Sequence, residues 1–297
     1  MYIIGIDGGG THTRLEVCDL EGKLLEKREF GSFNINSIGE ERFRQRIDEI
    51  FDPFGSLSEC ASICIGAAGI SAEIICNIIH SKLDKLGFHG KRLLRPDYAS
   101  ALRGAMAGPG AVLVCGTGSV AYGVCPDGRE IRVGGYGHLI DDGGSGYAIG
   151  RDGLILTVRM LDGRCEKTEL QDAILAAIGG TNVKDIVNFI YSSGNSKAAT
   201  ALLNLTVLDC ACNGDPMALE ILDQESRELV IMISTIMRQM KVKPLRLALL
   251  GGLMEHDTLY RRIVQDKLSA FAQLVSPEHD AIYGATRLAL EQLTKTD

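Results

Sequence analysis

The sequence predicts an α/β protein made of two related domains. Its 297 residues exceed what one small hydrophobic core holds. Residues 1–110 alternate strand-like and helix-like patterns, which favours a mixed sheet covered by helices on both faces. The opening pattern of strand, glycine turn, strand, acidic–glycine hairpin and strand then returns from residue 111. This repetition indicates two related domains that each present a glycine turn to one shared ligand.

The chain opens with three short predicted strands. Residues 2–6 are apolar, and the glycines at 8–10 form a tight turn. In residues 15–20 apolar and charged side chains are interleaved, which indicates a second strand. The Glu–Gly pair at 21–22 then turns the chain into a third strand at 23–30.

Helices and strands alternate in the segment that follows. An amphipathic helix runs up to Pro53, which ends it because the residue before a proline is disfavoured in the helical conformation. Residues 62–67 predict a buried strand, 72–86 a helix and 91–95 a strand, after which Asp97 opens a helix to residue 106. The inward faces of the first two helices are predicted to be Phe43, Ile47, Ile50 and Phe51, and Ile74, Ile75, Ile78, Ile79 and Leu83.

The second half repeats the opening and then becomes mostly helical. The repeated strands, turns and hairpin fall at residues 111–115, 116–119, 120–124, 126–128 and 130–133.

Asp215 and Pro216 predict the capped start of a long helix whose apolar side chains recur near helical spacing. Residues 245–250 predict the last strand, and 281–293 a closing helix. The apolar positions of the long helix are Leu219, Leu222, Leu229, Val230, Ile233 and Met237.

Composition excludes several classes of partner and site. The net charge of −7 argues against nucleic acid and anionic membranes as partners. No segment approaches the roughly 18 apolar residues of a membrane helix, and no basic leader precedes the first strand, so we expect a cytoplasmic protein. The nine cysteines form no CxxC pair and are expected to be reduced, and the six histidines show no zinc-binding spacing.

The first glycine turn carries the clearest chemical signal. Gly8, Gly9 and Gly10, followed by Thr11 and Thr13, allow close backbone approach, and successive N–H groups in such a turn bind anions. Asp7, at the strand end ahead of the turn, suits a magnesium ion that bridges phosphates, usually through water. A plain hairpin turn is the alternative, although a hairpin does not need three glycines.

Two later glycine sites extend the phosphate hypothesis. Gly116, Thr117, Gly118 and Ser119 form the equivalent turn of the repeat, so they are expected to hold phosphates too. This turn is neither a Walker A loop, since no Gly-Lys-Ser/Thr follows, nor a Rossmann fingerprint, since a hairpin follows it. Gly251 and Gly252 leave room for an adenine or ribose, with a strand-to-helix turn as the alternative.

Carboxylates at two further places are candidates for proton transfer and for binding a sugar or a metal. Asp97 follows a strand, where open α/β sheets place ligands, and could accept a hydroxyl proton during phosphoryl transfer. Its alternative role is an N-cap. The glycine-rich segment 134–147 is predicted to be an irregular functional loop in which Asp141 and Asp142 bind sugar hydroxyls or a metal, or form a solvated acidic turn.

Together these motifs resemble the N-acetylglucosamine kinase and BadF/BadG-type ATPase family, within the sugar kinase, heat-shock chaperone and actin superfamily. The resemblance covers nearly the whole chain. It rests on residues 5–11, the helix start at 97–101, the turn at 116–119, the loop at 134–150 and the glycines at 251–252.

The resemblance implies an actin-like ATPase fold of two ribonuclease-H-like domains with ATP in the cleft between them. The first domain is expected at residues 1–110, joined by the C-terminal helix 281–297. The second is expected at 111–280 and carries helical additions.

The resemblance also implies roles for individual residues. Asp7 positions Mg²⁺, the turns at Gly8 and Gly116 hold the ATP phosphates, and Asp97 is the base for the 6-hydroxyl of an amino sugar. The expected substrate-binding residues are Asn34, Gly69, Asp97, Ser119, Gly135, Asp142 and Ser145.

One departure from the family pattern affects the sugar loop. The family usually has Gly-Asp-Glu-Gly-Ser, whereas this chain has Asp141 and Gly143 around Asp142. The added acid would suit a cationic amino group, as in glucosamine.

The leading hypothesis is an ATP-dependent kinase of N-acetylglucosamine or a close amino sugar, expected to be a homodimer. One alternative is an ATP-driven activator of a CoA-ester dehydratase or reductase, although only Cys115 lies near a phosphate turn. A sugar-sensing repressor is a third, disfavoured by the charge and by the absence of residues for a DNA-binding module before the first turn.

Overall fold

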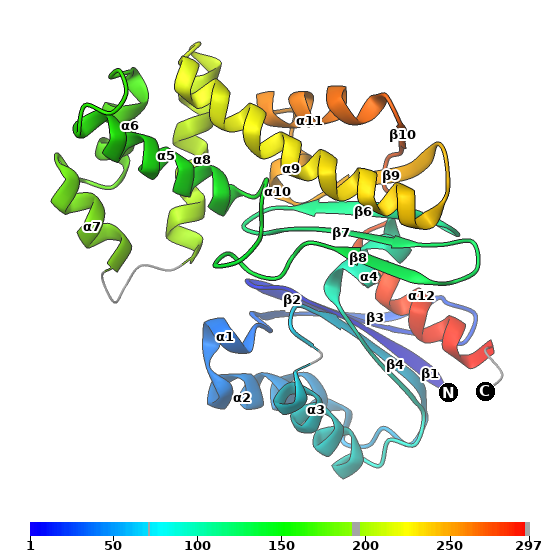
Figure 1. The fold of residues 1–297 in the computed structure, drawn as a ribbon. Coiled ribbons are helices and arrows are strands. Elements are labelled where there is room, and N and C mark those ends of the chain that lie inside the picture. The colour runs from blue at the N-terminus through cyan, green and yellow to red at the C-terminus, as the bar shows by residue number, and fades with distance from the viewer. Residues whose placement is uncertain (71, 192–196, 295–297) are drawn as a thin grey trace. The chain divides into compact units, whose positions relative to one another are not determined.

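The computed structural model describes residues 1–70, 72–191 and 197–294, with the backbone alone for residue 36. The chain forms two compact units (Figure 1). Unit 1 comprises Met1–Gly108 and the C-terminal segment from Ser276, and unit 2 comprises Pro109–Val275. In the described part of the chain, no helix combines the length and apolar character needed to cross a membrane.

Unit 1 is built on a five-stranded mixed sheet in the order β3-β2-β1-β4-β5. The hairpin strands β2 and β3 run antiparallel beside β1, while β4 and β5 run parallel to it on the other side. The strands are β1 (Tyr2–Gly8), β2 (His12–Cys18), β3 (Leu24–Gly31), β4 (Cys60–Ala67) and β5 (Lys91–Arg95).

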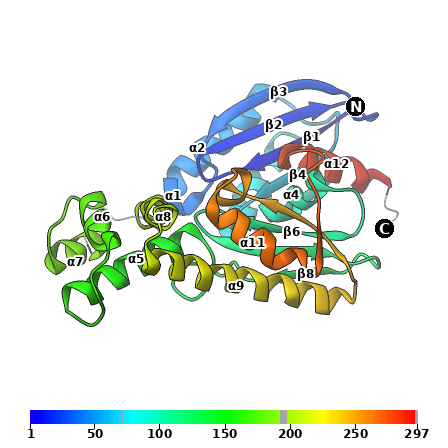
Figure 2. The ribbon, with the colours of Figure 1, turned by 90° about the horizontal axis from the view of Figure 1, so that it is seen from above.

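Helices cover both faces of this sheet (Figures 1 and 2). Alternate residues of β1 point to opposite faces, so Ile4 and Ile6 pack with α2 and α3 while Ile3 packs with α12. The helical elements are α1 (Ile35–Ile38), α2 (Glu40–Phe51), η1 (Asp52–Phe54), α3 (Glu73–Lys85), α4 (Asp97–Ala105) and α12 (Ala281–Thr294).

Unit 2 repeats the same arrangement of strands. Its sheet has the order β10-β9-β6-β7-β8, with the β7–β8 hairpin antiparallel beside β6 and with β9 and β10 parallel to it on the other side. The predicted structural repeat is therefore confirmed. The strands are β6 (Gly110–Cys115), β7 (Ser119–Val124), β8 (Glu130–Val133), β9 (Leu245–Leu250) and β10 (Ala272–Leu274).

The helices of unit 2 share one hydrophobic core with its sheet. The long helix α9 lies along the sheet, and α5 to α8 form a helical group beside it (Figure 1). Asp215 caps α9 as predicted, because its carboxylate accepts the N–H groups of Met217 and Ala218. The helices are α5 (Gly146–Leu161), α6 (Glu169–Ala177), α7 (Val183–Tyr191), α8 (Lys197–Cys212), α9 (Pro216–Met240), α10 (Gly252–Glu255) and α11 (Leu259–Ser269).

Three details of the predicted elements are corrected. Residues 245–250 are not the last strand, because β10 adds a short strand whose three residues give no clear alternation. Ile74 is not inward but 43% exposed, since it lies beside rather than on the apolar stripe of α3. Leu219 likewise lies at the exposed edge of the apolar face of α9.

Helix α12 packs against α4, and each helix has a glycine at the point of contact. A Cβ at Gly284 would fall on the carbonyl oxygen of Ser100, and a Cβ at Gly104 would fall on that of Asp280. The two backbones therefore approach more closely than any side chain allows. This contact attaches the C-terminal helix to the body of unit 1.

We predict that Gly284→Ala lowers the free energy of unfolding of unit 1 by about 1–3 kcal/mol, because the added methyl group forces the helices apart. Urea titration followed by circular dichroism measures the loss. Gly252→Ala is the matched control, since its added Cβ meets no atom within 4 Å. Equal unfolding midpoints for the two variants would contradict the tight crossing.

Candidate functional site

The predicted residues of unit 1 gather at the carboxyl edge of its sheet. Strands β1, β4 and β5 are parallel, and Asp7, Gly66 and Arg95 lie in one row across them. Gly69 and Asp97 follow the ends of β4 and β5 by two residues each, so they lie at the same edge as Asp7. Open α/β sheets bind their ligands at this edge.

The first glycine turn exposes backbone donors. The N–H of Gly9 donates to the carbonyl of His12 at 2.9 Å, and the carbonyl of Gly9 accepts from Phe33 at 3.0 Å. Within the described residues, the N–H groups of Gly10 and Thr11 donate to no protein acceptor. Both residues are exposed, so two adjacent donors are available to an anion.

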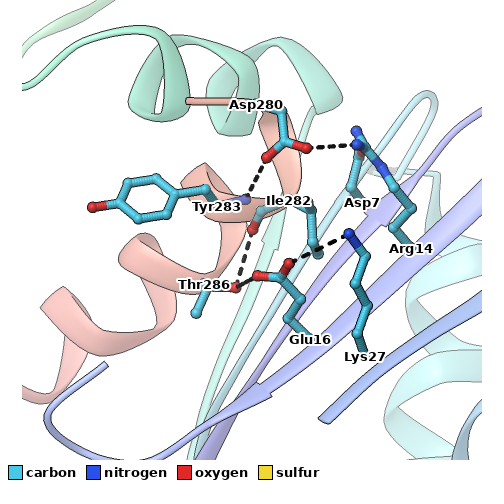
Figure 3. A network of polar contacts seen from close by, with 8 residues as sticks. All are labelled: Asp7, Arg14, Glu16, Lys27, Asp280, Ile282, Tyr283 and Thr286. Carbon is cyan, nitrogen blue, oxygen red and sulfur yellow. Dashed lines mark hydrogen bonds and ion pairs between the residues drawn. The ribbon is translucent and has the colours of Figure 1, made fainter. Parts of the chain in front are cut away.

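Asp7 belongs to a polar network that Figure 3 shows. One guanidinium nitrogen of Arg14 donates to Oδ2 of Asp7 at 2.7 Å, and another donates to Asp280 at 2.6 Å. Asp280 also accepts the N–H of Tyr283 and thereby caps α12. Arg14 thus links the carboxylate at the end of β1 to the start of α12. No described residue donates to Oδ1 of Asp7.

Thr13 is a correction to the predicted phosphate site. Its side chain is 0% exposed, and its hydroxyl donates to the carbonyl of Gly31 at 2.6 Å. The alternation of β2 turns Thr13 inward with Leu15, so its side chain holds two strands together instead of facing a ligand. At Gly8 the missing side chain leaves room for the ring of Phe33, 2.7 Å from where a Cβ would lie.

The remaining candidates of unit 1 sit at the starts of helices or in turns. Asp97 is the first residue of α4, and Pro96 holds the N-cap position instead. Its carboxylate accepts the N–H of Tyr98 at 2.9 Å and is partly exposed. The carbonyl of Asn34 accepts the N–H groups of Ser37 and Ile38, the last two residues of α1. Gly69 occupies an exposed turn with φ 71°, a conformation that favours glycine.

In the second glycine turn, after β6, as in the first, some backbone groups form hydrogen bonds within the protein and two N–H groups of the described residues do not. The carbonyls of Gly116 and Thr117 accept the N–H groups of Gly146 and Tyr147, the first residues of α5. The N–H of Gly116 donates to the carbonyl of Gly118 at 2.9 Å. In the part of the chain that the structure describes, the N–H groups of Thr117 and Gly118 have no protein acceptor. Two adjacent donors are again left for an anion.

Gly251 and Gly252 lie against this second turn. Val114 pairs with Leu250, so strands β6 and β9 end side by side. Gly251 has φ 91°, and a Cβ there would lie 2.5 Å from the carbonyl oxygen of Cys115. Helix α10 begins at Gly252, so these glycines also form the strand-to-helix turn that was the alternative. A strand-to-helix turn at these glycines is compatible with the expected adenine or ribose site.

The glycine-rich loop at residues 134–147 is fixed to the second turn and to the core of unit 2. The hydroxyl of Ser119 donates to the carbonyl of Gly143 at 2.6 Å. The carbonyl of Gly144 accepts from the hydroxyl of Tyr260 at 2.8 Å and from the thiol of Cys115 at 3.2 Å. The N–H of Gly144 donates to the carboxylate of Glu225. Both backbone polar groups of Gly144 are therefore engaged, the N–H by a carboxylate and the carbonyl by a hydroxyl and a thiol.

This arrangement corrects the predicted roles of two serines. Ser119 and Ser145 were expected to contact the substrate, but both side chains are buried and engaged within unit 2. Ser145 is the N-cap of α5, where its hydroxyl accepts the N–H of Ala148 at 3.2 Å. The two hydroxyls shape the loop. Sequence reasoning missed Glu225 and Tyr260 because each lies in an ordinary amphipathic helix without a local motif.

The two acids of the loop have different partners. Asp141 accepts the N–H of Tyr136 within the loop. Asp142 is buried, has φ 64°, and lies 2.5 Å from the ammonium of Lys197. A left-handed conformation costs a non-glycine residue free energy and is enriched at functional sites, although Asp adopts it more readily than most residues. Gly135 also has a positive φ, and a Cβ there would press on Val120.

A model of the BadF/BadG/BcrA/BcrD ATPase family matches residues 4–289 of the chain. The chain is 34% identical to an N-acetylmuramic acid/N-acetylglucosamine kinase of Clostridium acetobutylicum, over 97% of this chain and 98% of that one. It is 28% identical to an N-acetyl-D-glucosamine kinase of Dictyostelium discoideum, over 97% of each.

A solved structure has the same architecture. The crystal structure of a protein from Chromobacterium violaceum, assigned as an N-acetylglucosamine kinase, superposes with a TM-score of 0.77 at 27% identity. The match covers 97% of this chain and 98% of that one. The predicted actin-like sugar kinase fold is thereby confirmed.

Glu225 generates a prediction about pH. Burial raises the pKa of this carboxyl to about 7, although the N–H of Gly144 opposes the rise, and a hydrogen bond with Asp152 adds to it. The ordinary pKa of this carboxyl, 4.5, applies in the unfolded chain. Between pH 4.5 and about pH 7, Glu225 therefore keeps a proton in the folded protein that it has lost in the unfolded chain. Its contribution to stability therefore falls as the pH rises through that window.

We predict that Glu225→Gln gains stability relative to the wild type, by up to about 3 kcal/mol, between pH 4.5 and pH 8. Thermal unfolding of both proteins across this range measures the difference. Glu220→Gln, an exposed position on the same helix, is the control and should follow the wild type. Parallel curves for Glu225→Gln and the wild type would rule out a proton held on Glu225.

Proposed function

The chain belongs to the BadF/BadG/BcrA/BcrD ATPase family, and on this premise we propose that it is an ATP-dependent amino-sugar kinase. We propose further that it transfers the γ-phosphate to the 6-hydroxyl of N-acetylglucosamine or a related sugar such as glucosamine or N-acetylmuramic acid. The names of the relatives, which match over nearly their full lengths, support this choice of substrate class.

The observation that carries the proposal is the matching pair of glycine turns. Each follows the central strand of its sheet, and each keeps two neighbouring N–H groups free of protein acceptors within the described residues. In the first turn these belong to Gly10 and Thr11, and in the second to Thr117 and Gly118. Phosphoryl transfer needs mainly positioning and charge stabilisation, which such fixed donors provide. The adenine or ribose is proposed to lie at Gly251 and Gly252.

Asp97 is the proposed general base. Its partly exposed carboxylate stands at the carboxyl edge of the unit 1 sheet, where it also accepts the N–H of Tyr98. A carboxylate in this place can accept the proton of the sugar hydroxyl as the phosphoryl group transfers. We propose that Asn34, Gly69, Gly135 and Asp142 contribute to the sugar site.

Asp7 fits the requirements of a magnesium site. Its side chain is 15% exposed, and Arg14 takes Oδ2 while leaving Oδ1 without a protein donor among the described residues. Mg²⁺ is commonly held by one or two carboxylates together with waters and phosphate oxygens. When bound, Mg²⁺ would neutralise charge on the ATP phosphates. We propose that Asp7 holds it, with Arg14 fixing the direction of the carboxylate.

The alternative function, an ATP-driven activator with an iron–sulfur cluster, is disfavoured by Cys115. This cysteine is the one beside a phosphate turn, but it is fully buried and donates to the carbonyl of Gly144. Burial raises the pKa of its thiol well above the usual range. A cluster ligand must be a thiolate, so Cys115 is a structural thiol.

We propose that the kinase works in the cytoplasm as a homodimer. The net charge of −7 and the reduced, mostly buried cysteines suit a reducing compartment. A symmetric dimer is the commonest state of soluble oligomers, and sedimentation of the purified protein measures it.

We predict that Asp97→Asn lowers kcat by about 10²- to 10⁴-fold while ATP affinity stays close to that of the wild type. The loss follows because an amide cannot accept the hydroxyl proton. Steady-state kinetics and calorimetric ATP titration measure the two quantities. Asp209→Asn, an exposed position on α8, is the control. If Asp97→Asn keeps more than a few per cent of the activity, Asp97 is not the base.

The sugar is identified by a coupled ADP-release screen. We expect turnover with at least one of N-acetylglucosamine, glucosamine and N-acetylmuramic acid, and little with glucose or N-acetylmannosamine. Asp142→Asn should raise KM for the preferred sugar more than KM for ATP, because its carboxylate is proposed to bind sugar hydroxyls. No sugar-dependent ADP release with any of the five would overturn the kinase proposal.

A further inference from the structure

Lys197 lies at the centre of the unit 2 site, although none of the sequence motifs includes it. It is the first residue of α8, and its ammonium lies 2.5 Å from Oδ2 of Asp142. The two side chains differ in exposure. That of Asp142 is 4% exposed, whereas that of Lys197 is 32% exposed. Lys197 therefore neutralises a buried charge and remains accessible from outside.

Both charged groups press against the second glycine turn. A Cβ at Gly118 would lie 3.0 Å from Nζ of Lys197 and 3.0 Å from Oδ2 of Asp142. Glycine at position 118 thus allows an ammonium and a carboxylate to contact the backbone of the turn. The free N–H groups of Thr117 and Gly118 belong to the same short segment. An anion bound by these N–H groups would lie beside the ammonium.

Charge explains why a cation is needed at this place. A carboxylate next to an anion-binding turn repels phosphate, and the repulsion is strong where water is excluded. Lys197 offsets the charge of Asp142. An ammonium also has three donors, and the contact with Asp142 uses one of them. The other two can be shared with a phosphate oxygen.

We propose that Lys197 is a phosphate-binding residue of the second turn, where its ammonium contacts the phosphates of the nucleotide while it remains paired with Asp142. The inference rests on the proposed kinase function. It adds a side-chain cation to a phosphate site that otherwise consists of backbone donors. It also places one residue in contact with both the phosphate turn and the carboxylate proposed to bind the sugar.

A simpler role would make Lys197 only the counter-ion of Asp142. The two roles differ in what happens when both side chains lose their charge. If Lys197 acts only through Asp142, a neutral residue at position 142 removes the need for the ammonium. If Lys197 contacts phosphate, its loss weakens nucleotide binding whichever residue stands at position 142.

The test is calorimetric titration of ATP with Mg²⁺, without sugar, into the full-length wild type and four variants. These are Lys197→Met, Asp142→Asn, the double variant Lys197→Met/Asp142→Asn, and Lys184→Met. Lys184 is exposed on α7 and controls for the change in net charge. We expect Lys197→Met and the double variant to raise the Kd for ATP by about 10- to 100-fold. Lys184→Met should bind ATP about as tightly as the wild type. Asp142→Asn should bind it at least as tightly, because the change removes a negative charge beside the turn while Lys197 remains.

Two results would overturn the inference. The first is a Kd for Lys197→Met equal to that of the wild type. The second is a double variant that binds ATP as tightly as Asp142→Asn alone. If Lys197→Met fails to fold because a buried carboxylate is left unpaired, the comparison of Asp142→Asn with the double variant decides alone. A wild type that binds no ATP would instead overturn the proposed function, and with it this inference.

Discussion

The site depends above all on the parallel pairing of each central strand with its neighbour, β1 with β4 and β6 with β9. Parallel strands bring their carboxyl ends to one edge, so residues far apart in sequence become neighbours there. This pairing places Gly252 beside Gly116 in unit 2 and places Asp7 at the edge reached by Asp97 in unit 1. The antiparallel hairpin on the other side then forces the chain to turn sharply after the central strand. The glycine turns are the result.

Each turn is useful because its carbonyl groups are already engaged. In unit 2 the start of α5 takes the carbonyls of Gly116 and Thr117, while the N–H groups of Thr117 and Gly118 have no protein acceptor among the described residues. The same helix begins at the loop of residues 134–147, in which Glu225 accepts the N–H of Gly144 while Tyr260 and Cys115 donate to its carbonyl. The second glycine turn and the loop of residues 134–147 are therefore parts of one hydrogen-bonded assembly. A displacement of either part would be transmitted to the other.

The sequence predicted the strands and the repeat well, because strand alternation and glycine turns are local signals. It was less informative about side chains. Thr13 looked like a phosphate ligand, but strand alternation buries it, and Ser145 looked like a sugar ligand but caps α5. Lys197 and Glu225 could not be found from sequence, because only the packing of α8 and α9 brings them to the loop. Motifs identify the turns, whereas tertiary contacts decide which side chains complete them.

The return of the chain to unit 1 has a consequence for biosynthesis. Unit 2 is continuous in sequence, but unit 1 needs α12, whose Ala285 and Ala289 cover Ile3 and Cys64 on one face of its sheet. Translation delivers α12 only after the whole of unit 2, so the order of completion is reversed relative to the order of synthesis. Until then only α4 covers this face of the unit 1 sheet, and the part that α12 shields stays exposed. The strands of unit 1 are therefore open to aggregation and chaperone binding while unit 2 is being made.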